Sequence, residues 1–136
     1  MRRAETLSVS LAVPFEQAWD FLSDPRNLHR WTVDFATAPP QPTANDAVFA
    51  VQTARGSLEL FVRCDQASGV IDFHFGRGGQ FRCSPSRLIR NDDGCIYVFT
   101  QFEPPGAAPG LFETLVANVR QELKLLRELL EHGHDQ

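Results

Sequence analysis

Residues 111–132 constrain the fold more than any other part of the chain. Their apolar residues recur at alternating steps of four and three: Phe112, Val116, Val119, Leu123, Leu126 and Leu130. This spacing places them on one face of a helix, so the sequence predicts a long helix that is buried along most of its length. Charged residues such as Glu122 and Lys124 are expected to lie mostly off this face. Because the preceding sequence is strand-like, the predicted partner of the helix is an antiparallel sheet.

The N-terminal region predicts one strand followed by two short helices. Residues 7–13 alternate apolar and polar side chains, which is typical of a half-buried strand. Pro14 ends that strand and suits the first turn of a helix over residues 15–22, where apolar residues recur at helical spacing. Asp24 can cap a second short helix that runs to about Trp31.

Residues 38–102 are expected to supply the remaining strands. Three prolines in residues 38–46 suit an edge strand or a loop, and Pro85 is expected to break a later strand. The sequence Asn91-Asp92-Asp93-Gly94 predicts a tight hairpin turn. The predicted fold class is therefore α+β, with a curved antiparallel sheet of about seven strands, two short helices near the N-terminus and one long C-terminal helix. A chain of 136 residues predicts a single domain over residues 1–136.

The charge and hydropathy of the chain exclude several function classes. Thirteen Lys and Arg against seventeen Asp and Glu give a net charge of −4, which disfavours nucleic acid as a partner. No apolar run approaches the ~20 residues that cross a bilayer, so no stable membrane insertion is expected. The alternating residues 6–13 do not form the apolar core of a signal peptide, which predicts a cytoplasmic protein.

The residues that most often carry chemistry form no known constellation along the sequence. The spacings of Cys64, Cys83 and Cys95 match no zinc ribbon and no CxxC pair, so free thiols without a metal are predicted. His74 and Asp72 lie on one face of a predicted strand, where neighbours are ~7 Å apart, which disfavours a general base pair. The glycine-rich residues 76–80 join two strands and open no helix, which argues against a phosphate cradle. We therefore predict no catalytic residue, no metal and no cofactor.

Aromatic residues are more informative, since the chain holds eleven Phe, two Trp and one Tyr. A long sheet cannot close tightly on a single helix along its whole length, and the remaining space is either filled by aromatic side chains or kept as a pocket. Both alternatives stay open at this point. If a pocket exists, the candidates for its ligand-binding lining are Trp31, Phe49, Leu60, Phe73, Phe81, Tyr97, Phe99 and Val119.

The sequence resembles the START/Bet v 1-like (SRPBCC) superfamily, including the bacterial polyketide cyclase/dehydrase-like and lipid-transport proteins. The resemblance covers the whole chain in element order, and it is carried by the first strand LSVSLAV, Pro14, Ala18-Trp19-Asp20-Phe21-Leu22, Ser23-Asp24-Pro25, Trp31 and the terminal stretch LFETLVANVRQELKLLRELLE. It implies a helix-grip fold with a cavity between the sheet and the last helix. Members bind hydrophobic small molecules, and some are enzymes, but they share no catalytic motif that maps onto this chain.

The expected function is the binding or transport of a small hydrophobic ligand, without catalysis. One alternative is an enzyme of the polyketide cyclase or dehydratase type, for which Tyr97 is the best polar candidate in the sequence. Another is a homodimeric interaction module with a filled core. A deep cavity with a buried acid–base pair would favour the enzyme. A deep apolar cavity would favour the binding or transport of a ligand without catalysis.

Overall fold

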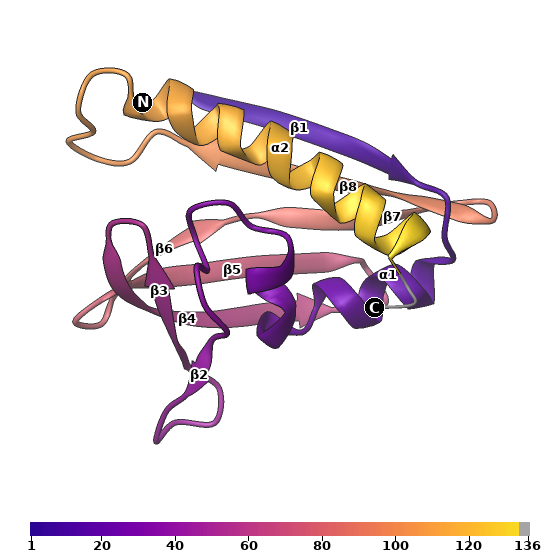
Figure 1. Cartoon of the computed structure of the whole chain (residues 1–136), viewed down its shortest axis with the longest axis horizontal. Coiled ribbons are helices and arrows are strands. Elements are labelled where there is room, and N and C mark those ends of the chain that lie inside the picture. The colour runs from indigo at the N-terminus through magenta and orange to yellow at the C-terminus, as the bar shows by residue number, and fades with distance from the viewer. Residues whose placement is uncertain (134–136) are drawn as a thin grey trace.

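A computed structural model describes residues 1–133 of the chain and shows one antiparallel sheet that curves around a long helix (Figure 1). The helices over these residues are α1 (Phe15–Leu22), the 3-10 helix η1 (Pro25–Arg30) and α2 (Leu111–His132). The strands are β1 (Ala4–Leu11), β2 (Gln41–Pro42), β3 (Phe49–Thr53), β4 (Gly56–Asp65), β5 (Val70–Arg77), β6 (Gln80–Ser84), β7 (Ser86–Asn91) and β8 (Gly94–Phe102). The predicted fold class is confirmed. The two-residue β2 lies in the proline-rich segment that was expected to form an edge strand or a loop.

The sheet has the strand order β1-β8-β7-β5-β4-β3-β2, and β6 pairs with β5 beside this path. Pro85 separates β6, which pairs with β5, from β7, which pairs with β8. Proline donates no ladder hydrogen bond, so the strand changes partner at this position. The Ser86 hydroxyl donates a hydrogen bond to the carbonyl of Ile71, and this side chain links β7 to β5 where their ladder is short.

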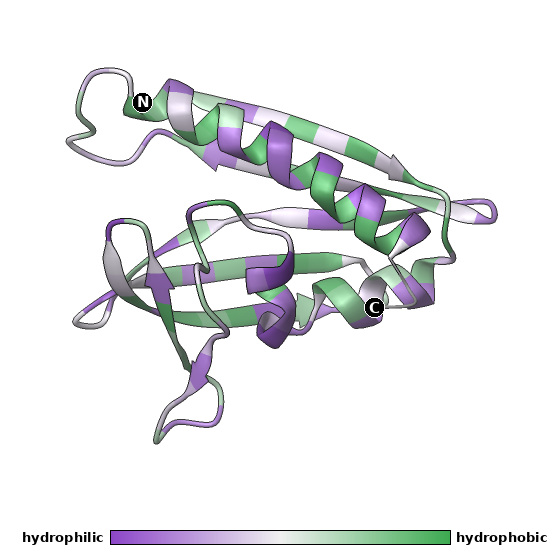
Figure 2. Cartoon of the chain, in the orientation of Figure 1, coloured by the Kyte–Doolittle hydropathy of each residue, from purple (hydrophilic) through white to green (hydrophobic). Residues whose placement is uncertain are grey.

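Helix α2 runs beside β1 and β8 on the concave face of the sheet (Figure 1). Its predicted apolar face is buried at Phe112, Val119, Leu123, Leu126 and Leu130, and Val116 packs against the same core. Figure 2 shows the alternation of apolar and polar residues along this helix. None of the helices within residues 1–133 is long and apolar enough to cross a membrane.

The groove between the sheet and α2 has two parts with different packing. At one end, which we call the closed half, α1 covers β7 and β8, and the side chains of Leu11, Leu22, Leu88 and Leu126 are almost fully buried. At the other end, which we call the open half, the chain after η1, strands β5 and β6, the end of β8 and the N-terminal part of α2 surround an internal space. That space is the candidate site.

Candidate functional site

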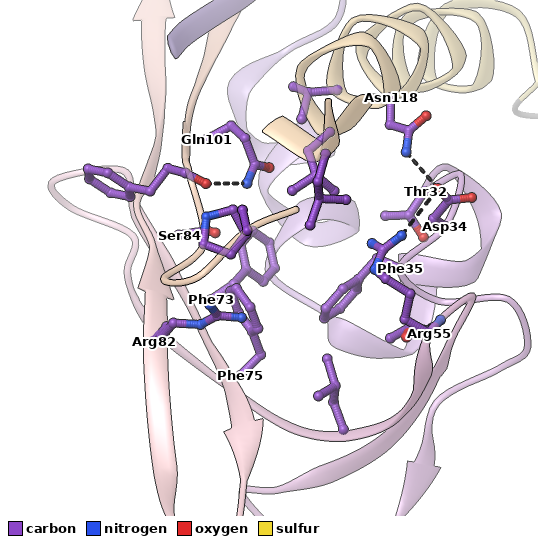
Figure 3. A pocket seen from close by; sticks show the side chains of 18 of the residues that line it. Thr32, Asp34, Phe35, Arg55, Phe73, Phe75, Arg82, Ser84, Gln101 and Asn118 are labelled. Carbon is purple, nitrogen blue, oxygen red and sulfur yellow. Dashed lines mark hydrogen bonds and ion pairs between the residues drawn. The ribbon is translucent and has the colours of Figure 1, made fainter. Parts of the chain in front are cut away.

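The open half contains a cavity of about 420 Å³ that is partly open to solvent (Figure 3). This volume lies within the ~300–1,000 Å³ of typical small-molecule sites. Much of its wall is apolar, with aromatic and aliphatic side chains from six parts of the fold: Leu28, Trp31, Phe35, Leu58, Phe73, Phe75, Phe99, Phe102, Leu111, Leu115 and Val119. The phenylalanines therefore border a cavity in this structure and do not fill it.

Aromatic pairs hold the apolar wall together. Phe35, in the loop after η1, meets Phe75 of β5 edge to face, with ring centroids 5.7 Å apart. Trp31 packs edge-on against Tyr97, at 6.1 Å between centroids. Such pairs stabilise by ~0.5–1.5 kcal/mol beyond the burial of their area. The loop after η1 is thus fixed against the sheet at both of its aromatic residues.

The conformation of that loop follows from polar residues at the two ends of η1. Asp24 accepts a hydrogen bond from the backbone N–H of Arg26 at 3.0 Å and caps η1, as the sequence predicted. Beyond η1, the Thr32 hydroxyl donates to the carbonyl of Leu28 at 2.8 Å and accepts from the N–H of Ala36 at 3.1 Å. This one side chain closes the turn that places Asp34 and Phe35 at the cavity.

One side of the cavity is polar, and it joins three elements (Figure 3). The Asn118 side chain of α2 donates from Nδ2 to Asp34 Oδ2 at 2.7 Å. Arg55, in the turn between β3 and β4, places Nη1 3.9 Å from the same oxygen. The backbone N–H of Ala54 also donates to the carbonyl of Asp34 at 2.8 Å. Asp34 therefore connects α2 to the far edge of the sheet across one side of the cavity.

Glu122 is the titratable group of the cavity that is most perturbed. It lies one helical turn after Asn118, is half-buried, and accepts a hydrogen bond from the N–H of Val33 at 2.9 Å. Burial raises the pKa of Glu122 to about 7; the hydrogen bond from Val33 opposes this rise, and the charge of Asp34 adds to it. At neutral pH this carboxyl group is therefore able both to donate and to accept a proton.

The rim of the cavity carries four arginines, Arg2, Arg55, Arg77 and Arg82, and all four are exposed. Arg77 donates to the carbonyl of Ser57, and Arg55 faces Asp34. Arg82 instead lies over the ring of Phe75, 5.4 Å from its centroid, and has no ion pair within residues 1–133. A cation without a carboxylate partner is thus present beside the aromatic wall.

Four of the eight residues proposed from the sequence line this cavity, namely Trp31, Phe73, Phe99 and Val119. The other four do not border it. Leu60 and Tyr97 are fully buried in the core, Phe49 pairs with Leu60 across β3 and β4, and Phe81 packs on Phe61, 5.0 Å away between ring centroids. Contact of any of the eight with a ligand stays a prediction.

Tyr97 was the polar candidate from the sequence, but the polar groups at the cavity are others. Its hydroxyl is buried without a hydrogen-bond partner in the described part of the chain, and the neighbouring Ser86 donates to the Ile71 carbonyl. Asp34, Asn118 and Glu122 were not foreseen. For Asn118 and Glu122 the sequence signal is their i, i+4 spacing beside the apolar residues Leu115 and Val119, whereas Asp34 has no such signal. Glu122 was expected mostly off the buried face, and the structure places it at the cavity wall.

Comparison with known proteins gives likeness in structure and none in sequence. No protein-family model matches the chain, and a search of curated proteins finds no match. Among solved structures, an uncharacterized protein from Bacillus thuringiensis superposes with a TM-score of 0.74 at 12% identity, covering 94% of this chain and 98% of the other. A START superfamily protein from Mycobacterium smegmatis gives 0.68 at 14% identity, covering 96% and 98%.

A third solved structure similar to this chain is the di-domain ARO/CYC BexL from the BE-7585A biosynthetic pathway. Its TM-score is 0.73 at 12% identity, with 95% of this chain covered. This chain spans 46% of BexL, about half its length. Identities this low establish the fold alone, and the helix-grip fold of START/Bet v 1-like proteins that the sequence resemblance implied is confirmed.

Proposed function

We propose that the protein binds a small apolar ligand in the cavity between the sheet and α2. The observation that carries this proposal is a cavity of about 420 Å³ with a mainly aromatic and aliphatic wall. Burial of ~300 Å² of ligand apolar surface at ~25 cal/mol/Å² contributes about 7 kcal/mol before the costs of association. Micromolar affinity requires about 8 kcal/mol net, so apolar burial alone falls short. We therefore expect the ligand to carry a polar group as well.

The rim favours an acidic group at that position. Arg82 lies over Phe75 without an ion pair among residues 1–133, so a ligand whose apolar body contacts Phe75 places an acidic end near this guanidinium. Charge-assisted hydrogen bonds from arginine to an acid are shorter and stronger than neutral ones. The proposed ligand is thus an apolar small molecule with an anionic end.

Binding of two fluorescent probes tests this proposal. We expect anilinonaphthalene sulfonate, which is acidic, and Nile red, which is neutral, to bind saturably with one molecule per chain. Leu115→Trp places a large side chain at the cavity wall and should abolish binding of both probes. Leu125→Trp is the matched control, because Leu125 is exposed on the same helix and does not line the cavity.

Arg82→Gln separates the role of the rim from that of the cavity. It should weaken binding of the sulfonate probe about tenfold and leave Nile red unchanged. Equal loss in Leu115→Trp and Leu125→Trp, or no saturable binding in the unmodified protein, would refute the proposal.

A second function is favoured by Glu122, whose pKa near 7 within a cavity is the property of a general acid or base. We infer that Glu122 is the proton-transfer group in this alternative function, an enzyme of the cyclase or dehydratase type. Incubation with a reactive poly-β-ketone chain, followed by mass spectrometry of the products, tests this. Glu122→Gln should stop product formation and keep probe binding, whereas undiminished turnover in this variant excludes Glu122.

A further inference from the structure

The outer face of the sheet, opposite the cavity, brings together three side chains that are typical metal ligands. Asp72 and His74 alternate along β5 with Phe73 and Phe75, so they lie on the outer face. Cys83 of β6 pairs directly with His74 across the ladder. The ligand atoms of these three half-buried residues all lie within 4.8 Å of one another.

The hairpin between β5 and β6 sets this register. Its two turn residues, Gly78 and Gly79, have φ angles of 61° and 79°, the left-handed conformation of the tight turns that join adjacent antiparallel strands. With Arg77 paired to Gln80, His74 comes to lie opposite Cys83. Spacing along the chain does not reveal this, because the two residues approach only through the ladder. The glycine-rich segment thus has a structural role that brings two potential ligands together.

The imidazole of His74 is held in place and has an unused nitrogen. Its ring stacks on Phe61, with centroids 4.6 Å apart and planes 3° from parallel, and Phe61 in turn packs on Phe81. His74 Nε2 is shielded from solvent and has no hydrogen-bond partner within the described chain. A shielded polar atom left without a partner costs ~1–3 kcal/mol, so it requires an explanation. A metal–nitrogen bond would satisfy such an atom.

We propose that Asp72, His74 and Cys83 form a site for a divalent transition-metal ion, with Zn²⁺ the best fit to the donor set. Thiolate sulfur, imidazole nitrogen and carboxylate oxygen are the three zinc donors of proteins, and water completes four-coordination. The thiol of Cys83 loses its proton on binding, so thiolate and carboxylate together balance the charge of the ion. This site departs from the metal-free cysteines that the sequence predicted. Cys83 belongs to both places, because it is also among the residues that line the cavity on the other face of the sheet.

Cobalt is the probe that tests this site, because a thiolate–Co²⁺ bond gives an intense charge-transfer band. We expect reduced, metal-free protein to bind one Co²⁺ with this band, and Zn²⁺ to displace it. Cys83→Ser should abolish the band, while Cys64→Ser, which removes an exposed thiol that is not in the cluster, should keep it. His74→Ala and Asp72→Asn should each weaken affinity about tenfold or more.

A second measurement needs no variant. Zn²⁺ should protect Cys83 from alkylation and leave Cys64 reactive, as read by mass spectrometry of the digested protein. The proposal fails if no thiolate band appears at saturating Co²⁺, if the band persists in Cys83→Ser, if His74→Ala binds Co²⁺ unchanged, or if Zn²⁺ protects neither thiol.

Discussion

The closed and open halves of the groove share one helix but differ in what that helix meets. In the closed half, Leu126 and Leu130 of α2 pack into a continuous core, and Leu126 is fully buried. In the open half, Leu115, Asn118 and Glu122 of the same helix line the cavity. The comparison shows that the two ends of one helix differ in role: one end packs into the core, whereas the other end lines a cavity.

The two tryptophans differ in the same way. Trp19 of α1 stacks on Phe15 in the closed half, with ring centroids 5.9 Å apart, and Arg90 lies over the Phe15 ring at 3.9 Å. Trp31 is also buried, with 4% of its surface exposed, but one of its sides borders the cavity. Burial alone therefore does not distinguish a residue inside the core from a residue that borders the cavity.

The largest expected effect that tests the difference between the closed and open halves is a change in the stability of the fold. Leu126→Ala removes a fully buried side chain from the closed half and should lower the free energy of unfolding by ~2–5 kcal/mol. Leu125→Ala, at the exposed neighbouring position, should change it by less than about 0.5 kcal/mol. Urea unfolding followed by circular dichroism measures both. Equal denaturant midpoints for the two variants would show that the closed half is not the stabilising region.

The next effect is spectroscopic and compares the two tryptophans directly. Binding of a hydrophobic probe should quench tryptophan emission, and Trp31→Phe should remove most of that change, whereas Trp19→Phe should not. The probe affinity of each variant is measured separately by probe emission, so that loss of the reporter is not mistaken for loss of binding. A response that survives undiminished in Trp31→Phe would place the probe elsewhere.

A smaller effect concerns pH. The folded pKa of Glu122, about 7, lies above its ordinary value of 4.5, so the folded protein binds this proton more tightly than the unfolded chain. Its stabilising contribution is complete below pH 4.5 and is lost as pH rises through about 7. Glu122→Gln should therefore gain stability relative to the unmodified protein between pH 5 and pH 8. Glu128→Gln, at an exposed position of α2, should show no such trend, and a parallel trend in both variants would contradict the assignment.

The smallest expected effect is at Tyr97, which lies outside the cavity lining. Tyr97→Phe removes a hydroxyl that is buried without a hydrogen-bond partner among residues 1–133. The free energy of unfolding should therefore change by less than about 1 kcal/mol, or rise slightly. Probe affinity should be unaffected. A large loss of stability would mean that the hydroxyl makes a bond, with Ser86 as its nearest candidate, and a loss of probe binding would place Tyr97 at the ligand.

Much of the fold could be predicted from the spacing of apolar residues and from the proline and glycine residues that end helices and strands. The apolar face of α2, the cap at Asp24 and the strand break at Pro85 are each encoded within a few neighbouring residues, and each is present in the structure. Such local patterns are reliable because they reflect the geometry of a single element. The identity of the fold was therefore accessible from the sequence alone.

The site was accessible only in part, because its residues meet through tertiary contacts. Phe73 and Phe99 were foreseen as candidates for the cavity lining, and both line it. Asp34 is brought to Asn118 by a turn that Thr32 closes, and no local pattern announces such a contact. The pairing of His74 with Cys83 likewise depends on strand register. The polar residues of a site are thus harder to predict than the apolar ones, because a single polar contact produces no repeating pattern in the sequence.

The pairing of β1 with β8 has a consequence for how the protein is made. These strands run side by side from Ala4 opposite Phe102 to Leu11 opposite Cys95, so the first strand of the chain pairs along its whole length with the last. During synthesis β1 emerges before β8, and it finds its partner only after residue 102 has left the ribosome. Contacts this distant in sequence slow folding, and in the interval an unpaired strand with one apolar face is exposed to other chains. The nascent protein thus remains open along this edge until its final strand and the helix that follows it have been synthesised.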